Sequence, residues 1–393
     1  MYKRLTIFYF SLFLFFTGCL SPNFNLEVSS DLEPNLAMVK IDKWLKDLSL
    51  KRKFNGAILI ALDGKSDLIG TYGFSDVART KPLTKQSSFR LASVSKQFTA
   101  MGIMILKEQG KLNYDNYVRD YLNAFPYPDI TIRHLLTHTS GLPDYEKLVL
   151  RLKNKASTKY FFRTGQSREN IIYKGDPSEF KNLHDILAMQ DILNLVIEYS
   201  DERKFSAGEK FNYSNTGYVL LAYIIERVTG QTFENFLDQE IFNPLRMKNS
   251  SVWNLNTISG KMNDRVYGTN KEKLNDFTWM DGIAGDGAVF VSIEDFLKWD
   301  IALTNNFLVS DSTFQDAITP FITTNGDTSF YGFGWALSHD DYSIDHAGGW
   351  VGALTYIYRN PENGVLFVLL DSSTNKDFKK IRESILEILY EIY

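Results

Sequence analysis

The sequence predicts an α+β fold, an α/β sandwich in which one antiparallel sheet is built from both chain ends and flanked by helices. Strand patterns gather near the two ends, at 56–62, 66–73, 330–337, 342–346, 350–359 and 365–370. Between the two groups, from about 112 to 283, the pattern is that of helices and loops, which predicts an inserted helical subdomain. Terminal helices at 37–50 and 377–392 are expected to cover the sheet.

Local signals define the elements between these limits. Asp63-Gly64 is a two-residue hairpin signal that joins the first two strands. Apolar periodicity predicts further helices at 93–106, 131–137, 185–199, 215–228, 232–243 and 293–303. A short strand is expected at 287–291, and Gly348-Gly349 is expected to separate two later strands. The polar segment 146–184 is expected to form a surface excursion.

The first residues have the layout of an export signal. Lys3 and Arg4 precede an apolar run at 5–16, which is too short to span a bilayer as a stable helix. Phe16-Thr17-Gly18-Cys19 is similar to a bacterial lipoprotein cleavage box, so we expect Cys19 to be lipidated. An ordinary signal peptide or an uncleaved membrane stub is the alternative.

These signals set the expected organisation: a signal peptide at 1–18, a polar tether at 19–35 and one folded domain at 36–393. The protein is then expected to be exported and lipid-anchored to a bacterial cell-envelope membrane. Cys19 is the only cysteine, so no intrachain disulfide can form. The formal charge of -4 and the absence of a basic stripe give no reason to expect a nucleic-acid partner.

Ser93 and Lys96 form the first candidate catalytic pair. They are three residues apart, so both side chains project from one face of the predicted helix. Lys96 is the only charge between Arg90 and Lys107, which places a lysine in an apolar wall, where burial favours the neutral, basic form. A serine one turn before it is an activated nucleophile. The pattern alone is weak, because the sequence repeats it at Ser178–Lys181 and Ser373–Lys376.

Three further motifs contain polar side chains suited to chemistry: Tyr213-Ser214-Asn215, His346-Ala347-Gly348-Gly349 and the segment 133–143. The last contains His134 and His138, whose spacing of four residues suits metal ligands on a helix. No third ligand lies nearby in the sequence, so we favour a structural role and expect neither metal nor cofactor.

The ordered set of motifs resembles the serine β-lactamase and penicillin-binding-protein superfamily: Ser-x-x-Lys at 93–96, Tyr-x-Asn at 213–215 and His-x-Gly at 346–348. Segment 135–143, Leu-Leu-Thr-His-Thr-Ser-Gly-Leu-Pro, is similar to one common in the class C-like branch, which includes esterases, D-aminopeptidases and D,D-peptidases. Tyr331-Gly332-Phe333-Gly334-Trp335 resembles the same branch. The resemblance covers about 44–393.

This resemblance implies roles for the first two motifs. Ser93 is expected to attack a carbonyl group and form an acyl-enzyme. Lys96 and Tyr213 are expected to share proton transfer, with Tyr213 as base and as acid to the leaving group. Asn215 is expected to orient Lys96 or to bind the substrate amide. No role is assigned to Asp286, where many relatives have glycine.

The third motif bears on the substrate. The backbone N–H groups of Ser93 and Gly349 are expected to form an oxyanion hole, with Gly348 beside them. His346 takes the place of the usual lysine, which can hold a β-lactam carboxylate. Histidine is mostly neutral near pH 7, unless a neighbour such as Asp345 raises its pKa and lets it bind a carboxylate as imidazolium.

The resulting hypothesis is a serine hydrolase acting on amides or esters, similar to D,D-peptidases, D-aminopeptidases or esterases, with β-lactamase activity ranked below these. The expected partner is a small molecule or peptide: a peptidoglycan-like peptide, an ester or a β-lactam. The alternative function is a penicillin-binding sensor or scaffold that is acylated without turnover, or not acylated at all.

Overall fold

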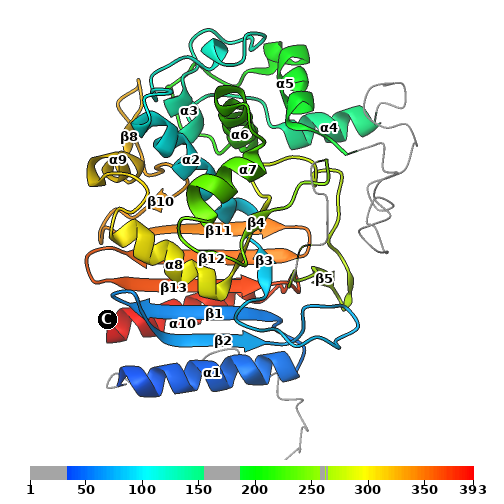
Figure 1. Cartoon of the computed structure of the whole chain (residues 1–393), viewed down its shortest axis with the longest axis vertical. Coiled ribbons are helices and arrows are strands. Elements are labelled where there is room, and N and C mark those ends of the chain that lie inside the picture. The colour runs from blue at the N-terminus through cyan, green and yellow to red at the C-terminus, as the bar shows by residue number, and fades with distance from the viewer. Residues whose placement is uncertain (1–32, 155–185, 257–261, 263) are drawn as a thin grey trace, which may run out of the picture.

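The computed structural model describes residues 33–154, 186–256, 262 and 264–393 (Figure 1). Among these residues, a sheet of six antiparallel strands has the order β10-β11-β12-β13-β1-β2. Its strands are β1 (Gly56–Leu62), β2 (Lys65–Tyr72), β10 (Ala336–Leu337), β11 (Ile344–Trp350), β12 (Ala353–Asn360) and β13 (Val365–Asp371). The first strand of the chain therefore lies beside the last, and the predicted fold class is confirmed.

The sheet is buried on both faces because its central strands are apolar throughout. In β1, Ile58 and Ile60 face a core shared with the terminal helices α1 (Pro34–Leu50) and α10 (Phe378–Ile392). Leu59 faces the larger core on the opposite side, since successive residues of a strand point to opposite faces. One sheet thus separates the terminal helices from the rest of the molecule (Figure 1).

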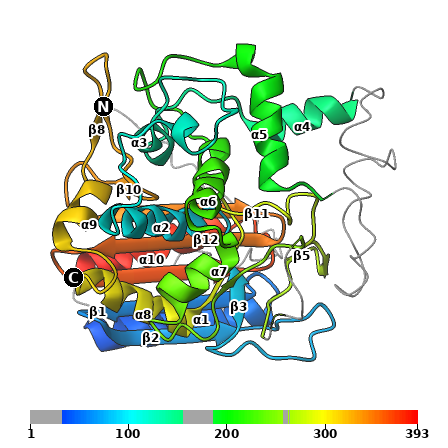
Figure 2. The same ribbon diagram turned by 45° about the horizontal axis from the view of Figure 1, so that its top comes forward.

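The larger core contains the remaining helices. Figure 2 shows α2 and α8 over this side of the sheet, with α6 and α7 beside them. The helices are α2 (Lys96–Glu108), α3 (Ile132–Leu136), α4 (Tyr145–Asn154), α5 (Met189–Glu198), α6 (Asn215–Thr229), α7 (Phe233–Leu237), α8 (Ile293–Thr304) and α9 (Asp311–Ala317). Phe98 of α2 stacks on Trp299 of α8 with ring centroids 4.3 Å apart, which joins the two helices.

Short elements complete the described structure. A small sheet has the order β3-β7-β4, from β3 (Ser88–Arg90), β7 (Val289–Ser292) and β4 (Ser251–Val252). Two small hairpins pair β5 (Thr269–Asn270) with β6 (Lys273–Leu274) and β8 (Phe321–Ile322) with β9 (Thr328–Ser329). The 3-10 helices are η1 (Ala92–Ser95), η2 (Val118–Asp120) and η5 (Ser200–Glu202), and Asp238–Phe242 is a π-helical turn.

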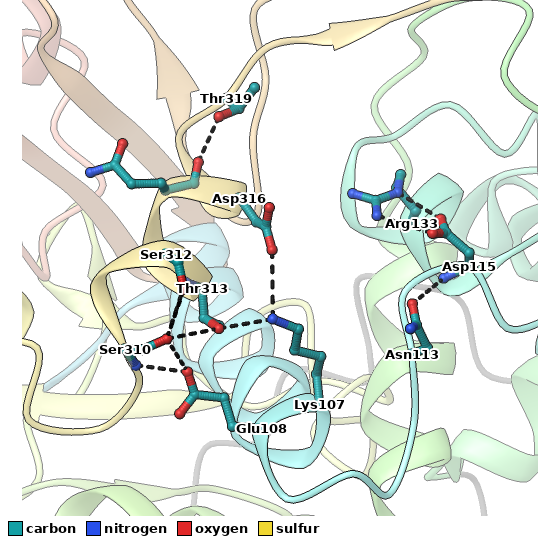
Figure 3. Close-up of polar contacts among 11 residues, drawn as sticks. Lys107, Glu108, Asn113, Asp115, Arg133, Ser310, Ser312, Thr313, Asp316 and Thr319 are labelled. Carbon is teal, nitrogen blue, oxygen red and sulfur yellow. Dashed lines mark hydrogen bonds and ion pairs between the residues drawn. The ribbon is translucent and has the colours of Figure 1, made fainter.

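The C-terminal end of α2 is held by α9 and the residue before it (Figure 3). The backbone N–H of Ser310 donates to Glu108 Oε1 at 2.7 Å, and Lys107 Nζ donates to Thr313 Oγ1 at 3.0 Å. These contacts join segments about two hundred residues apart, because α9 follows the inserted region. They fix the far end of the helix that begins at Lys96.

The turn chemistry and some boundaries follow from local sequence. Asp63 and Gly64 have φ values of 48° and 73°, as a type I′ hairpin requires, and they join β1 to β2 as predicted. Ser292 caps α8 by accepting the N–H of Asp295. Helix α1 begins at Pro34, inside the expected tether, because proline suits the first turn of a helix.

Other expectations were wrong. The strand expected at 330–337 is reduced to Ala336–Leu337, and Gly348-Gly349 does not break a strand but lies inside β11. The region 112–283 is not all helix and loop, because β4 pairs with β7 at Ser251↔Phe290. In each case backbone pairing with another strand decided the outcome, and the residue types of one segment do not reveal such pairing.

Several predictions concern residues outside the described ranges: the signal peptide 1–18, Cys19, most of the tether 19–35 and most of the excursion 146–184. Within the described ranges, no helix is both long and apolar enough to cross a bilayer.

The terminal helix offers a test of the packing. Ile385 of α10 is fully buried against the sheet. Ile385→Ala is expected to lower the free energy of unfolding by about 2–5 kcal/mol, because it leaves a cavity in a packed core. Urea denaturation measures this, with Glu387→Ala on the exposed side of the same helix as the control, expected to change stability by less than about 0.5 kcal/mol. Equal effects would contradict the described packing.

Candidate active site

Ser93 lies in η1, between β3 and α2, so the expected helix starts as a tighter 3-10 turn. Ala92 before it has φ 51°, a left-handed conformation that is costly for alanine and that packing must hold in place. Ser95 Oγ accepts the N–H of Val289 at 3.1 Å, and Thr99 Oγ1 donates to the carbonyl oxygen of Gly285 at 2.7 Å. The segment 285–289 thus anchors the turn that carries Ser93.

Lys96 is fully buried, and its amine is satisfied by oxygen atoms. Among the described residues, Nζ lies 3.2 Å from Ser93 Oγ, 2.8 Å from Asn215 Oδ1 and 2.9 Å from the carbonyl oxygen of Asp286. Three acceptors match the three donors of an ammonium group. The sequence predicted a neutral, basic amine at Lys96. The three acceptors around the amine suit its charged form instead.

Tyr213 and Asn215 are placed by the start of α6. Ser214 caps this helix by accepting the N–H of Gly217 at 3.3 Å, so its two neighbours sit at a fixed helix entry. Asn215 reaches Lys96, while Tyr213 is 38% exposed, with its ring centroid 5.0 Å from Lys96 Nζ. The predicted phenol and amide therefore meet the predicted lysine.

Strand β11 lies directly against the serine turn, and Gly348 allows it. A Cβ at position 348 would stand 2.5 Å from the carbonyl oxygen of Leu91, closer than real atoms approach. Thr355 Oγ1 of the neighbouring strand donates to the same oxygen at 2.7 Å. Any side chain at 348 would push the strand away from Ser93.

Gly349 is exposed and directs its N–H toward the free edge of β11. A two-residue turn at 351–352 joins β11 to β12, with Trp350 opposite Ala353. The closing pair of such a hairpin exchanges both backbone hydrogen bonds, so the N–H of Gly349 points away from β12. In the described structure β10 pairs only with the first two residues of β11, which leaves that N–H uncovered.

His346 has the surroundings of a neutral imidazole. Its Nε2 lies 2.9 Å from Tyr331 Oη, and its Nδ1 lies 2.8 Å from the carbonyl oxygen of Ala347. A proton on Nδ1, donated to that carbonyl, and a phenol O–H donated to Nε2 satisfy both contacts. Burial, together with the positive charge of Lys96, lowers the pKa of His346 to about 3.

Asp345 does not act on His346 as the sequence suggested. Asp345 Oδ2 accepts a hydrogen bond from Tyr356 Oη at 2.6 Å. Adjacent residues of a strand point to opposite faces, so this carboxyl cannot pair with the imidazole. The idea that Asp345 raises the pKa of His346 is therefore wrong.

His134 and His138 have separate surroundings. His134 Nδ1 lies 3.2 Å from the N–H of Thr131 at the start of α3. His138 is fully buried, accepts the N–H of Ser214 at 3.2 Å, and has its ring centroid 4.2 Å from that of Tyr213. Within the described ranges, no group of three or more His, Cys, Asp or Glu side chains is arranged to hold a metal ion. His138 instead supports the Tyr213 loop.

The structure adds residues that the motifs did not identify. Glu146, assigned to the surface excursion, lies in the first turn of α4 and accepts from Asn215 Nδ2 at 2.8 Å. Tyr331 holds His346. Tyr145 Oη donates to Asp286 Oδ2 at 2.9 Å behind Lys96. Two features of the sequence could have identified these residues. Glu146 lies just after the 133–143 motif, and Tyr331 begins the Tyr-Gly-Phe-Gly-Trp segment.

Sequence and structure comparisons relate this chain to known proteins. The family model described as Beta-lactamase matches residues 41–390. Penicillin-binding protein 4* of Bacillus subtilis (strain 168) is 34% identical over 328 residues, which are 79% of this chain and 66% of that protein. Protein flp of Staphylococcus aureus (strain N315) is 25% identical over 364 residues, 89% of this chain and 66% of that protein. The matches thus span just under two thirds of the length of these relatives.

Solved structures share the fold. The octameric penicillin-binding protein homologue from Pyrococcus abyssi superposes with a TM-score of 0.71 at 24% identity, covering 90% of this chain and 77% of that one. The D-amino acid amidase from Ochrobactrum anthropi SV3, complexed with L-phenylalanine amide, gives 0.68 at 21% identity, covering 91% and 99%. The fold and the match over 41–390 agree: this chain belongs to the beta-lactamase family, within the serine β-lactamase and penicillin-binding-protein superfamily.

Proposed function

We propose that this protein is a serine hydrolase that cleaves amide or ester bonds through an acyl-enzyme on Ser93. The observation that carries the proposal is the buried Lys96 amine, 3.2 Å from Ser93 Oγ and bound by Asn215. Family membership supports it, and the D-amino acid amidase shows that this fold accommodates amide hydrolysis. No resident metal or cofactor is needed for this chemistry.

The proposed reaction has two steps, acylation of Ser93 and hydrolysis of the acyl-enzyme. Ser93 Oγ attacks the carbonyl carbon while Tyr213 takes the serine proton, and the N–H groups of Ser93 and Gly349 stabilise the oxyanion. Tyr213 then delivers the proton to the departing amine or alcohol, which leaves an acyl group on Ser93. The phenolate of Tyr213 then takes a proton from a water molecule as the water attacks this ester. The same proton returns to Ser93 Oγ when the carboxylic acid leaves, so both residues are restored.

Lys96 supports this assignment electrostatically. A free tyrosine titrates near pH 10, so a phenol that acts as base needs a positive charge nearby. The Lys96 amine faces the Tyr213 ring at 5.0 Å and donates to Ser93 Oγ. As an ammonium, it orients the nucleophile and supplies a positive charge beside the Tyr213 ring.

The surroundings of the site favour substrates that carry no carboxylate where the usual third-motif lysine would bind one. A neutral His346 cannot hold a carboxylate as a lysine would. Glu146 adds a carboxyl group beside Asn215. We therefore place peptidase, D-aminopeptidase or esterase activity above efficient β-lactamase activity. The substrate is a small ester, amide or peptide, including the peptides of peptidoglycan.

We also propose that the protein is exported and anchored through a lipid on Cys19, as the cleavage-box pattern at 16–19 indicates. The folded domain would then act at the surface of a cell-envelope membrane.

The nucleophile is tested with an activated aryl ester and a fluorophosphonate probe. Ser93→Ala is expected to abolish labelling and to lower ester turnover on the order of 10⁴-fold or more, because the attacking oxygen is lost. Ser373→Ala, in the second described Ser-x-x-Lys sequence, is the control and is expected to keep both. Full labelling of Ser93→Ala would refute the assignment. A stoichiometric burst without turnover would instead support the penicillin-binding sensor or scaffold.

Substrate charge is tested by comparing two esters that differ only in a free carboxylate. Since the pKa of His346 is about 3, it stays neutral from pH 5 to 8, and the ratio of the two KM values is expected to stay flat. His346→Lys is expected to lower KM for the carboxylate ester roughly tenfold, through a charge-assisted hydrogen bond. A wild-type preference for the carboxylate ester that disappears near pH 6.5 would show that His346 binds as imidazolium.

Anchoring is tested by expressing the full chain in a bacterium and separating detergent and aqueous phases. Cys19→Ser is expected to shift the protein to the aqueous phase or to leave its leader uncleaved, since the thiol that carries the lipid is gone. Ser30→Ala in the tether is the control and is expected to remain with the detergent. Unchanged partitioning and unchanged mass for Cys19→Ser would contradict the lipid anchor.

A further inference from the structure

Asp286 is a buried acid that the proposed reaction leaves unused. Its carbonyl oxygen accepts from Lys96 Nζ at 2.9 Å, so its backbone is already part of the site. Its side chain is 1% exposed, and its Oδ2 accepts from Tyr145 Oη at 2.9 Å. Within the described structure, its other carboxyl oxygen, Oδ1, is buried without a hydrogen-bond partner.

A half-satisfied buried carboxyl is costly, which argues against a purely structural role. A buried charge is tolerated when an opposite charge offsets it, and leaving one buried acceptor unpaired destabilises the folded state. Alanine or leucine would fill this space without that penalty. The carboxyl therefore needs a compensating charge, and Lys96, whose amine binds the backbone carbonyl of the same residue, is the cation that acts on it.

The charged and titratable groups that act on this carboxyl are Lys96, Tyr145 and Glu146. Burial raises the pKa of Asp286 to about 6, and the Glu146 carboxyl adds to the rise, whereas Lys96 and the Tyr145 hydrogen bond oppose it. Glu146 reaches Lys96 indirectly, since it binds the amide of the same Asn215 that holds the amine. Asp286 is thus ionised above about pH 6 and neutral below it.

We propose that Asp286 is the counter-charge of Lys96: its buried carboxylate holds the amine as ammonium and thereby leaves the role of base to Tyr213. This role rests on the proposed hydrolase function. Asp286 acts through Lys96 and touches no reacting atom, so it is a positioning residue. No bond to it is made or broken.

The partition of roles between Lys96 and Tyr213 follows from this counter-charge. With the carboxylate in place, removing a proton from Lys96 would leave a negative charge alone in an apolar site. Without it, desolvation favours the neutral amine, which can then accept the serine proton directly. Substituting Asp286 should therefore change which residue is essential, which a loss of packing would not do.

The test uses the pH dependence of acylation by the fluorophosphonate probe and the activated ester. Wild type is expected to show an inflection near pH 6 in the acylation rate, and Asp286→Asn is expected to lack it. Asparagine retains the shape and the acceptor for Tyr145. Tyr145→Phe is the matched control: it removes the hydrogen bond that lowers the pKa of Asp286, so the inflection should persist and move to higher pH.

A double-variant comparison gives the decisive readout. Tyr213→Phe is expected to slow acylation about 10²- to 10⁴-fold in the wild-type background, the usual range for losing a general base. In the Asp286→Asn background the same substitution is expected to cost at least about tenfold less, because Lys96 can take over. Circular dichroism and urea denaturation establish that each variant is folded.

The failures are distinguishable. If Asp286→Asn keeps the inflection near pH 6, and Tyr213→Phe costs the same in both backgrounds, the counter-charge role is overturned while Ser93-dependent labelling still supports the hydrolase. If labelling does not depend on Ser93, the proposed function falls and the role of Asp286 falls with it. If Asp286→Asn does not fold, the pH dependence of acylation in Tyr145→Phe provides the test. An inflection that stays unshifted in this variant overturns the counter-charge role of Asp286.

Discussion

The site depends on one buried amine and the oxygens that surround it. Lys96 Nζ takes its acceptors from Ser93, from Asn215 at the start of α6 and from the backbone of Asp286. A buried ammonium is costly unless every donor is paired, so these segments have to arrive together. The serine turn η1, the start of α6 and the segment before β7 thus meet at the Lys96 amine. Because the Lys96 amine is buried, losing any one of these acceptors would leave a donor unpaired.

The backbone supplies what the side chains cannot. Ala92 holds a left-handed φ of 51° next to Ser93, and β11 approaches this turn so closely that only hydrogen fits at Gly348. The N–H of Gly349, the next residue of β11, is left unpaired by β10 and β12 in the described structure. Strain at Ala92 is sustained because the flanking side chains Ser95 and Thr99 are tied to the segment 285–289. Rigid backbone, rather than a mobile loop, defines the reactive geometry.

The Lys96 amine is surrounded by aromatic rings and by histidine side chains that carry no charge. Burial lowers the pKa of both His138 and His346, and the charge of Lys96 lowers each further, so neither ring adds a positive charge. The rings of Tyr213 and Tyr218 face the amine at 5.0 and 5.5 Å. Their π-faces stabilise a cation without competing for its hydrogen bonds. The carboxyl of Asp286 is the proposed counter-charge of this amine.

The sequence by itself determined the elements whose evidence is local: the type I′ turn at Asp63-Gly64, the cap at Ser292, the apolar β1 and the ordered motifs around Ser93, Tyr213 and His346. It also indicated that strands from both chain ends share one sheet. Periodicity, turn chemistry and motif order are properties of neighbouring residues, so they can be read along the chain.

Only the tertiary structure decided which of these groups interact and in what charge state. It separated Asp345 from His346, moved Glu146 from a supposed surface excursion to Asn215, and placed the backbone carbonyl of Asp286 against the Lys96 amine. It also reduced the strand expected at 330–337 and kept Gly348-Gly349 within β11. The physical reason is that pKa values depend on burial and strand limits depend on pairing with another strand. Neither can be read from the residue types of the segment itself.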